Sequence, residues 1–134
     1  MDVPSYAFRV HDERLAIARL DQAAPVPDWA RGRFVHVART PGELSIVCAQ
    51  EHVPAGVRHE RDKVALGIEG VVPMTVVGLL AKLCTALAGA RVPVFVISTY
   101  DTDWLLVDGA RLETARATLE GAGYPVRGAE PHRS

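Results

Sequence analysis

The sequence is poor in cysteine and has no excess of charge of either sign. Two of its 134 residues are cysteines, Cys48 and Cys84, and they lack the Cys-x-x-Cys spacing of a structural zinc site or a disulfide framework. Each lies in an apolar run, so we expect buried free thiols in a reducing cytoplasm. The net charge is −1, without a basic block that would attract nucleic acid or an anionic membrane.

A long uninterrupted hydrophobic run is also missing. The most apolar segment, residues 71–90, contains Pro73, Gly78 and Lys82 and has helical periodicity, which predicts a core helix rather than a membrane span. The N-terminus has no basic region followed by an apolar stretch, so the sequence predicts no secretion. We therefore expect a cytoplasmic protein with one ordinary core or two very small ones.

No set of catalytic or metal-binding residues is recognisable. The five histidines are scattered, and no pair has the His-x-x-x-His spacing of a metal site. A nucleophile elbow, a phosphate-binding glycine-rich loop and a dinucleotide fingerprint are absent. Asp101 and Asp103 lie in a tight turn without the further oxygen ligands of a calcium loop, and turn carboxylates commonly accept hydrogen bonds from turn amides. The sequence predicts no enzyme, no cofactor and no metal.

The first half of the chain has short alternating apolar patterns. The first two of them predict a hairpin or a bent strand, and Asp28 is placed to cap a single helical turn. The polar stretch of residues 51–62 predicts mostly loop. Strands are expected at residues 6–10, 15–20, 33–39 and 44–49.

The second half combines strand patterns with two helical stripes. Thr75 is placed to cap the first helix, and Gly89 is placed to end it. The order is β-α-β-β-α-β, followed by a polar tail, residues 129–134, that we expect to be disordered. The strands are expected at residues 63–69, 92–100, 104–107 and 124–127, and the second helix at about residues 110–122.

The two halves of the chain contain an internal repeat. Aligning Thr40 with Thr99 superposes strand on strand, turn on turn and strand on strand, and four apolar matches flank the shared threonine. This predicts two copies of a small α+β unit, residues 1–62 and 63–128, in tandem ferredoxin-like form with antiparallel sheets and a first unit that has lost most of its helices. The four matches are Val35 with Val94, Val37 with Val96, Ile46 with Leu105, and Val47 with Leu106.

Several strands have apolar residues on both faces. Residues 94–97 and 104–107 are examples, whereas a sheet that helices cover on one side needs only one apolar face. The first unit, a second chain, or both can cover the remaining face or edge. We therefore expect sheets packed side by side and a homodimer.

The loop before the first helix and the turn at Asp103 have the features of a small-molecule site. Free amides at a helix start attract a carboxylate, and Gly78 in the first turn lets a ligand approach the backbone closely. Asp103, in the neighbouring turn, can hold the opposite charge of a zwitterion. The two elements together are typical of an amino-acid pocket, although a capped helix beside an Asx turn is also common in proteins that bind nothing.

Three segments carry a resemblance to a known family. Residues 94–107, which read VFVISTYDTDWLLV, are preceded by residues 77–81 and by residues 43–47. Together these segments resemble the ACT-domain group that includes the CASTOR-type cytosolic arginine sensors and the regulatory domains of aspartate kinases. The resemblance implies the β-α-β-β-α-β fold, side-by-side pairing of units, and an allosteric amino-acid sensor whose ligand lies between units.

The resemblance also implies which residues contact the ligand. Asp103 would face a positive group of the ligand, and Tyr100 would form one wall of the pocket. Members of the family often have threonine where this chain has Val77, so one hydroxyl is missing. The arginine sensors have four units and this chain has two, so a complete set of sites requires a dimer. The implied ligand contacts are Ser45, Ile46, Gly78, Thr99, Tyr100 and Asp103.

Three functional hypotheses follow. The first is a non-catalytic regulatory ACT protein that binds a free amino acid, such as arginine or another basic one. The second is a structural or partner-binding ACT module with a degenerate pocket, with which Val77 is consistent. The third, a small enzyme such as a transferase, is the least supported because no catalytic constellation is visible.

Overall fold

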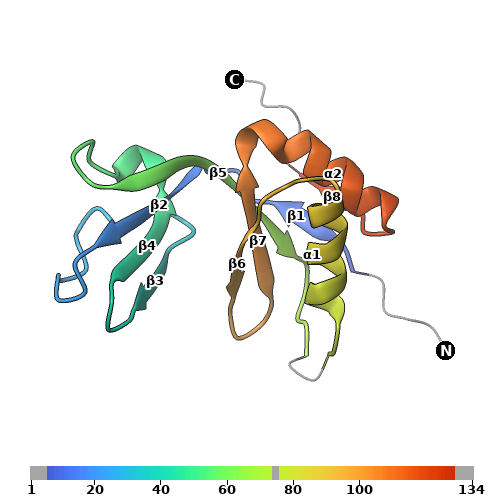
Figure 1. Ribbon diagram of the computed structural model, residues 1–134, viewed down its shortest axis with the longest axis horizontal. Coiled ribbons are helices and arrows are strands. Elements are labelled where there is room, and N and C mark those ends of the chain that lie inside the picture. The colour runs from blue at the N-terminus through green and yellow to red at the C-terminus, as the bar shows by residue number, and fades with distance from the viewer. Residues whose placement is uncertain (1–5, 74–75, 129–134) are drawn as a thin grey trace. The chain divides into compact units, whose positions relative to one another are not determined.

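The computed structural model describes residues 6–73 and 76–128 (Figure 1). The predicted cap Thr75 and the predicted disordered tail, residues 129–134, lie outside the described residues. The described chain divides into two compact units, which we call unit 1 (residues 6–12 and 64–128) and unit 2 (residues 13–63). The sequence placed residues 1–62 in one unit and residues 63–128 in the other, so the division differs from that expectation at residues 6–12 and at Lys63.

Unit 1 is built on five strands in the order β6-β7-β5-β1-β8. Strand β1 is antiparallel to β5 and parallel to β8, so it lies between them. Strands β6 and β7 form an antiparallel hairpin. The bounds are β1 (Phe8–Val10), β5 (His59–Ile68, of which the last five residues belong to this unit), β6 (Phe95–Ser98), β7 (Asp103–Asp108) and β8 (Val126–Arg127).

Two helices complete unit 1, and their apolar stripes face its core. The helices are α1 (Leu79–Gly89) and α2 (Leu112–Gly121), and the short 3₁₀ helix η2 (Gly109–Arg111) precedes α2. Leu83 and Leu87 of α1 lie one turn apart and are fully buried, as is Leu119 of α2. They pack with Phe8, Leu66 and Leu105 of the sheet in one hydrophobic cluster. The predicted β-α-β-β-α-β order, and with it the ferredoxin-like α+β fold, is confirmed.

Helix α1 begins at Leu79, four residues after the predicted cap Thr75. The residue before the helix is Gly78, whose φ of 87° is a left-handed conformation that a glycine adopts without strain. Among the residues that the structure describes, no side chain forms a capping hydrogen bond at the helix start. Within the described ranges, no helix is both long and apolar enough to cross a membrane.

Unit 2 is a sheet with the order β3-β4-β2-β5, all antiparallel. Residues 13–63 contain no α-helix and one 3₁₀ helix, η1 (Gln50–His52), as expected for a helix-poor unit. Its core cluster includes Ala18, Leu44 and Ile46, against which Trp29 packs. The strand bounds are β2 (Leu15–Leu20), β3 (His36–Arg39) and β4 (Leu44–Ala49), with β5 beginning at His59.

Three local predictions for the first half have different outcomes. Of the two alternatives for residues 6–20, the hairpin is wrong and the bent strand is confirmed, because β1 and β2 both run antiparallel to β5: β1 pairs with Leu66–Ile68, and β2 pairs with residues 59–63. Asp28 caps no helical turn, since residues 21–35 contain only turns and bends. The region of residues 51–62 is mostly outside strands, as expected, but its last four residues, 59–62, are strand because pairing with β2 extends β5 beyond its apolar part.

The hairpins β3–β4 and β6–β7 share the register that the alignment of Thr40 with Thr99 predicts. Val37 lies opposite Ile46, and Val96 lies opposite Leu105. In unit 2 the amide of Thr40 donates to the Glu43 carbonyl at 2.9 Å, and the amide of Glu43 donates to Thr40 Oγ1 at 3.2 Å. The repeat expected from the sequence is therefore present in backbone pairing.

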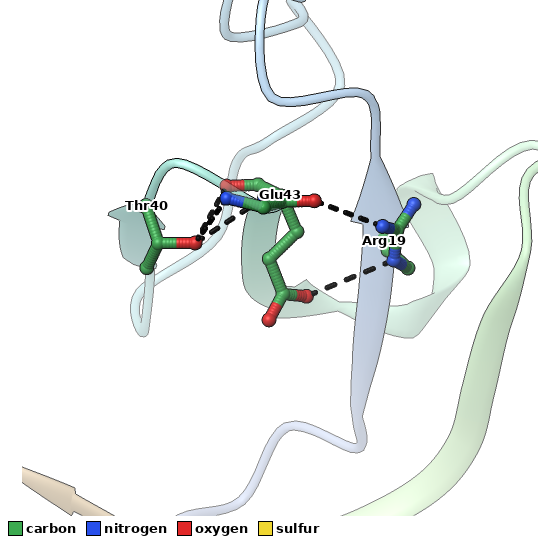
Figure 2. Close-up of polar contacts among 4 residues, drawn as sticks. Arg19, Thr40 and Glu43 are labelled. Atoms are coloured by element: carbon green, nitrogen blue, oxygen red, sulfur yellow. Dashed lines mark hydrogen bonds and ion pairs between the residues drawn. The ribbon is translucent and has the colours of Figure 1, made fainter.

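Figure 2 shows how the turn of unit 2 is closed by the neighbouring strand. Arg19, on β2, donates from Nη2 to the Gly42 carbonyl at 3.0 Å and forms an ion pair with Glu43 at 4.0 Å. Gly42 also donates its amide to Thr40 Oγ1 at 3.1 Å. The polar atoms of this turn are thus largely used within the unit itself.

Candidate functional site

A pocket of about 350 Å³ lies in unit 1 between the start of α1 and the β6–β7 turn. Its volume falls in the lower part of the range typical of small-molecule sites, roughly 300–1,000 Å³. Four of the six predicted ligand contacts line it: Gly78, Thr99, Tyr100 and Asp103. The remaining lining residues are Val72, Pro73, Val76, Leu79, Leu80, Ala81, Ser98 and Thr102.

One wall of the pocket is the N-terminus of α1. Gly78 and the first three helical residues, Leu79, Leu80 and Ala81, all line the pocket. The amides of these first helical residues have no acceptor within the helix, because the first intrahelical bond is the one from Lys82 to the Gly78 carbonyl, at 3.0 Å. The first turn contains no acidic residue. This wall therefore presents a positive helix end that suits a carboxylate.

The opposite wall is the β6–β7 turn. Asp103 is the first residue of β7 and is half-buried, and Ser98 Oγ donates to its Oδ1 at 2.5 Å. The Thr99 amide donates to the Thr102 carbonyl at 2.8 Å, which repeats the Thr40 turn of unit 2. Tyr100, at the tip, is 84% exposed. A carboxylate thus faces a pocket whose other wall is a helix N-terminus.

Two bonds hold the turn against the loop that follows β5. Thr102 Oγ1 donates to the Ile68 carbonyl at 2.9 Å. The amide of Val72 donates to the Asp101 carbonyl at 2.7 Å. Because Val72 and Thr102 both line the pocket, these bonds fix two of its walls relative to each other.

Ser98 and Thr102 line the pocket although the sequence reasoning did not select them. The signal was present, because a four-residue turn at 99–102 places the residues on either side of it, Ser98 and Asp103, opposite each other. Thr102 could not be found this way. Its hydroxyl bond joins residues 34 positions apart in the chain.

The other two predicted contacts, Ser45 and Ile46, lie on β4 of unit 2. The Ile46 side chain is fully buried, and its backbone is paired with Ala18 on one side and Val37 on the other. Ser45 is half-buried. Neither residue lines the pocket of unit 1, and their role in ligand binding stays a prediction.

A second pocket of about 480 Å³ lies beside the first and has more apolar walls. Gly78, Val76 and Leu79 line both pockets. Val77, where the family often has threonine, lines only this second pocket and is 94% exposed. A threonine hydroxyl at position 77 would therefore lie outside the lining of the pocket of unit 1. The other residues of the second pocket are Tyr6, Lys82 and Tyr124.

The cysteines lie outside both pockets. Burial raises the pKa of the Cys48 thiol, and a backbone hydrogen bond from Arg31 opposes the shift. Cys48 is buried as expected, whereas Cys84, on α1, is only half-buried. Among the residues that the structure describes, no three His, Cys, Asp or Glu side chains come together as a metal site.

Comparisons with known proteins agree with this architecture. An ACT-domain family model matches residues 58–121, and a second model, for an N-terminal domain, matches residues 13–56. Residues 58–121 are thus an ACT domain. The chain belongs to the same family as protein Atu0741 from Agobacterium tumefaciens, to which it is 30% identical over 98% of this chain and 99% of that one, with a TM-score of 0.89.

More distant structures share the fold. VC0802 from Vibrio cholerae, described as a protein of unknown function and possible transport protein, is 20% identical over 87% of this chain and 89% of that one (TM-score 0.69). The ligand-free regulatory subunit of aspartate kinase from Thermus thermophilus is 16% identical over 86% of this chain and 95% of that one (TM-score 0.55). No curated protein gives a significant match.

Proposed function

We propose that this chain is a non-catalytic regulatory ACT protein that binds a free amino acid and changes its conformation or association when the ligand is bound. The observation that carries the proposal is the pocket of unit 1, which is lined both by the N-terminus of α1 and by Asp103. An α-amino acid has one negative and one positive group at a short fixed separation. The two walls match those two charges.

In this proposal each end of the ligand has a specific partner. The α-carboxylate accepts hydrogen bonds from the amides of Leu79, Leu80 and Ala81. Asp103 receives a cationic group, and Tyr100 lies over the ligand from the tip of the turn. A basic amino acid such as arginine is the preferred candidate, because its side chain supplies a cation that Asp103 can bind while the carboxylate stays at the helix.

The proposed assembly is a homodimer whose ligand sites are completed between units. Strand β6 pairs only with β7 among the described residues, so the other edge of β6 is open to a second chain. Phe95, on β6, is 39% exposed, and Tyr100, at the end of the same hairpin, is more exposed still. A second copy that covers this edge would also enclose the pocket. In this proposal Ser45 contributes contacts from a neighbouring unit, and Ile46 does so only if β4 moves, because its side chain is buried and its backbone is paired on both sides.

The test is a thermal-shift screen of the twenty amino acids, followed by calorimetric titration of those that raise the Tm. A ligand that binds only the native state stabilises by about 2.7 kcal/mol at a hundredfold excess over its Kd. We expect the wild type to respond to arginine or lysine. We expect Asp103→Asn to lose that response while it keeps any neutral ligand.

Asp101→Asn is the matched control for this screen. It removes one carboxylate from the same turn, two residues away, and Asp101 does not line the pocket. The control is expected to respond as the wild type does. If no amino acid shifts the Tm of the wild type at millimolar concentration, the amino-acid proposal is wrong.

The second candidate is a partner-binding ACT module with a degenerate amino-acid site. It is favoured by the apolar second pocket, where Val77 is 94% exposed. Under this alternative no amino acid raises the Tm in the screen. A Val77→Asp variant would then lose a partner that the wild type binds.

A further inference from the structure

Ser98 and Asp103 face each other at the end of the β6–β7 hairpin, directly beside the turn. They are paired in the strand register, and the hydroxyl of Ser98 donates to Asp103 Oδ1 at 2.5 Å. Both residues line the pocket of unit 1. This is a short O–H···O bond of the kind formed with an ionised carboxylate.

The bond determines how Asp103 can meet a ligand. A serine hydroxyl has one proton, and here that proton is given to Oδ1. The side chain of Asp103 is thereby held in one orientation, and its Oδ2 is left to accept from a cation in the pocket. A carboxylate that is already oriented loses less conformational entropy when a ligand binds.

The hairpin of unit 2 indicates that this pair is not needed to form the turn. When Thr40 is aligned with Thr99, Ser98 and Asp103 correspond to Arg39 and Leu44, which are paired at the same position in the register. The Thr40 turn still forms, with backbone and Thr hydroxyl bonds like those of the Thr99 turn. The Ser98–Asp103 bond is therefore available for a role other than closing the hairpin.

We propose that Ser98 is a positioning residue that holds the Asp103 carboxylate for the cationic group of the ligand. This inference rests on the proposed amino-acid binding. Because Arg39 and Leu44 replace the pair in unit 2, each chain then has one such cation-binding position. The stoichiometry of the cationic ligand is one per chain.

The experiment titrates L-arginine and L-lysine by calorimetry into the wild type, Ser98→Ala, Ser98→Thr, Asp103→Asn and the Ser98→Ala/Asp103→Asn double variant. We expect Ser98→Ala to raise the Kd about three- to tenfold, which is the effect of losing one typical hydrogen bond. Ser98→Thr keeps the hydroxyl and is expected to bind within about twofold of the wild type. In the Asp103→Asn background, Ser98→Ala is expected to have no further effect, because its action passes through Asp103.

Arg39→Ala, at the equivalent position in unit 2, is the matched control and is expected to leave the Kd unchanged. If the wild type binds and Asp103→Asn weakens binding but Ser98→Ala does not, the role of Ser98 is overturned while the proposed function stands. If the Kd of Ser98→Ala rises as much in the Asp103→Asn background as alone, Ser98 does not act through Asp103. If the wild type binds no amino acid, both proposals fail.

Discussion

Gly67 is the residue of unit 1 whose lack of a side chain is most clearly explained by packing. It lies on β5, and a Cβ built there would be 2.5 Å from Cζ3 of Trp104 on the neighbouring strand β7. The indole lies against the glycine and makes an edge contact with His11, with 6.4 Å between ring centroids. The position therefore has no room for a methyl group unless the indole moves.

We expect Gly67→Ala to reduce the free energy of unfolding by about 1–3 kcal/mol, the range typical of overpacking. Gly89→Ala is the control, because a Cβ there meets nothing within 4 Å and the residue ends a helix, where alanine is favoured by up to about 1 kcal/mol. Urea denaturation followed by tryptophan fluorescence measures both. Equal stability of Gly67→Ala and the wild type would mean that Trp104 repacks without cost.

Residue identities in the pocket were partly predictable from the sequence. Gly78, Thr99, Tyr100 and Asp103 lie around one pocket because they belong to two short segments that a β-α-β-β unit brings together. The expectation for Cys84 was less accurate. It lies in an apolar run, but the buried stripe of α1 is formed by Leu83 and Leu87, and Cys84 lies beside that stripe.

Among the structural elements, the turn at Thr40 and the turn at Thr99 can be compared directly, because a threonine hydroxyl bonds to the backbone in both. Thr99 Oγ1 accepts from the Thr102 amide at 3.4 Å, and Thr40 Oγ1 accepts from the Glu43 amide at 3.2 Å. Both turns close an antiparallel hairpin of the same register. Only the Thr99 turn lines the pocket of unit 1.

Replacing either threonine with valine removes the turn hydroxyl and keeps the side-chain volume close to its original value. We expect each variant to lose about 0.5–1.5 kcal/mol of stability, as for a single hydrogen bond. Thr99→Val is also expected to weaken amino-acid binding, whereas Thr40→Val keeps the wild-type Kd. Thermal denaturation and calorimetric titration of the same samples separate the two effects, and equal loss of affinity in both variants would contradict the placement of the ligand in unit 1.

Element types were predicted better than strand partners. The β3–β4 and β6–β7 hairpins were expected because each pairs neighbouring segments across a short turn. For residues 6–10 and 15–20 the sequence left a hairpin and a bent strand open, and the structure has the bent strand, whose partners β5 and β8 come from the second half of the chain. The alternation of apolar residues defines a strand locally and carries no information on which distant strand it pairs with.

At the scale of the whole molecule, the open edge of β6 makes association testable. Phe95→Glu places a charge on this edge, and we expect it to convert a wild-type dimer to a monomer in sedimentation velocity. Val37→Glu is the control, because Val37 is 40% exposed on β3 of unit 2, so a similar charge is added elsewhere. A wild type that sediments as a monomer at all concentrations would contradict the homodimer, and a dimer unaffected by Phe95→Glu would place the interface elsewhere.

Four properties follow from the amino-acid sequence alone: the α+β class, the β-α-β-β-α-β order of the second half, the repeat that aligns Thr40 with Thr99, and the low helix content of the first half. These properties depend on local periodicity and turn chemistry, which neighbouring residues define. Long-range packing, in contrast, places β1 between β5 and β8 and joins residues 6–12 to the unit of residues 64–128. It also brings the start of α1 and Asp103 to one pocket. The physical reason is that strand pairing and pocket formation depend on which apolar faces are buried together, and residues far apart in the chain compete for those positions.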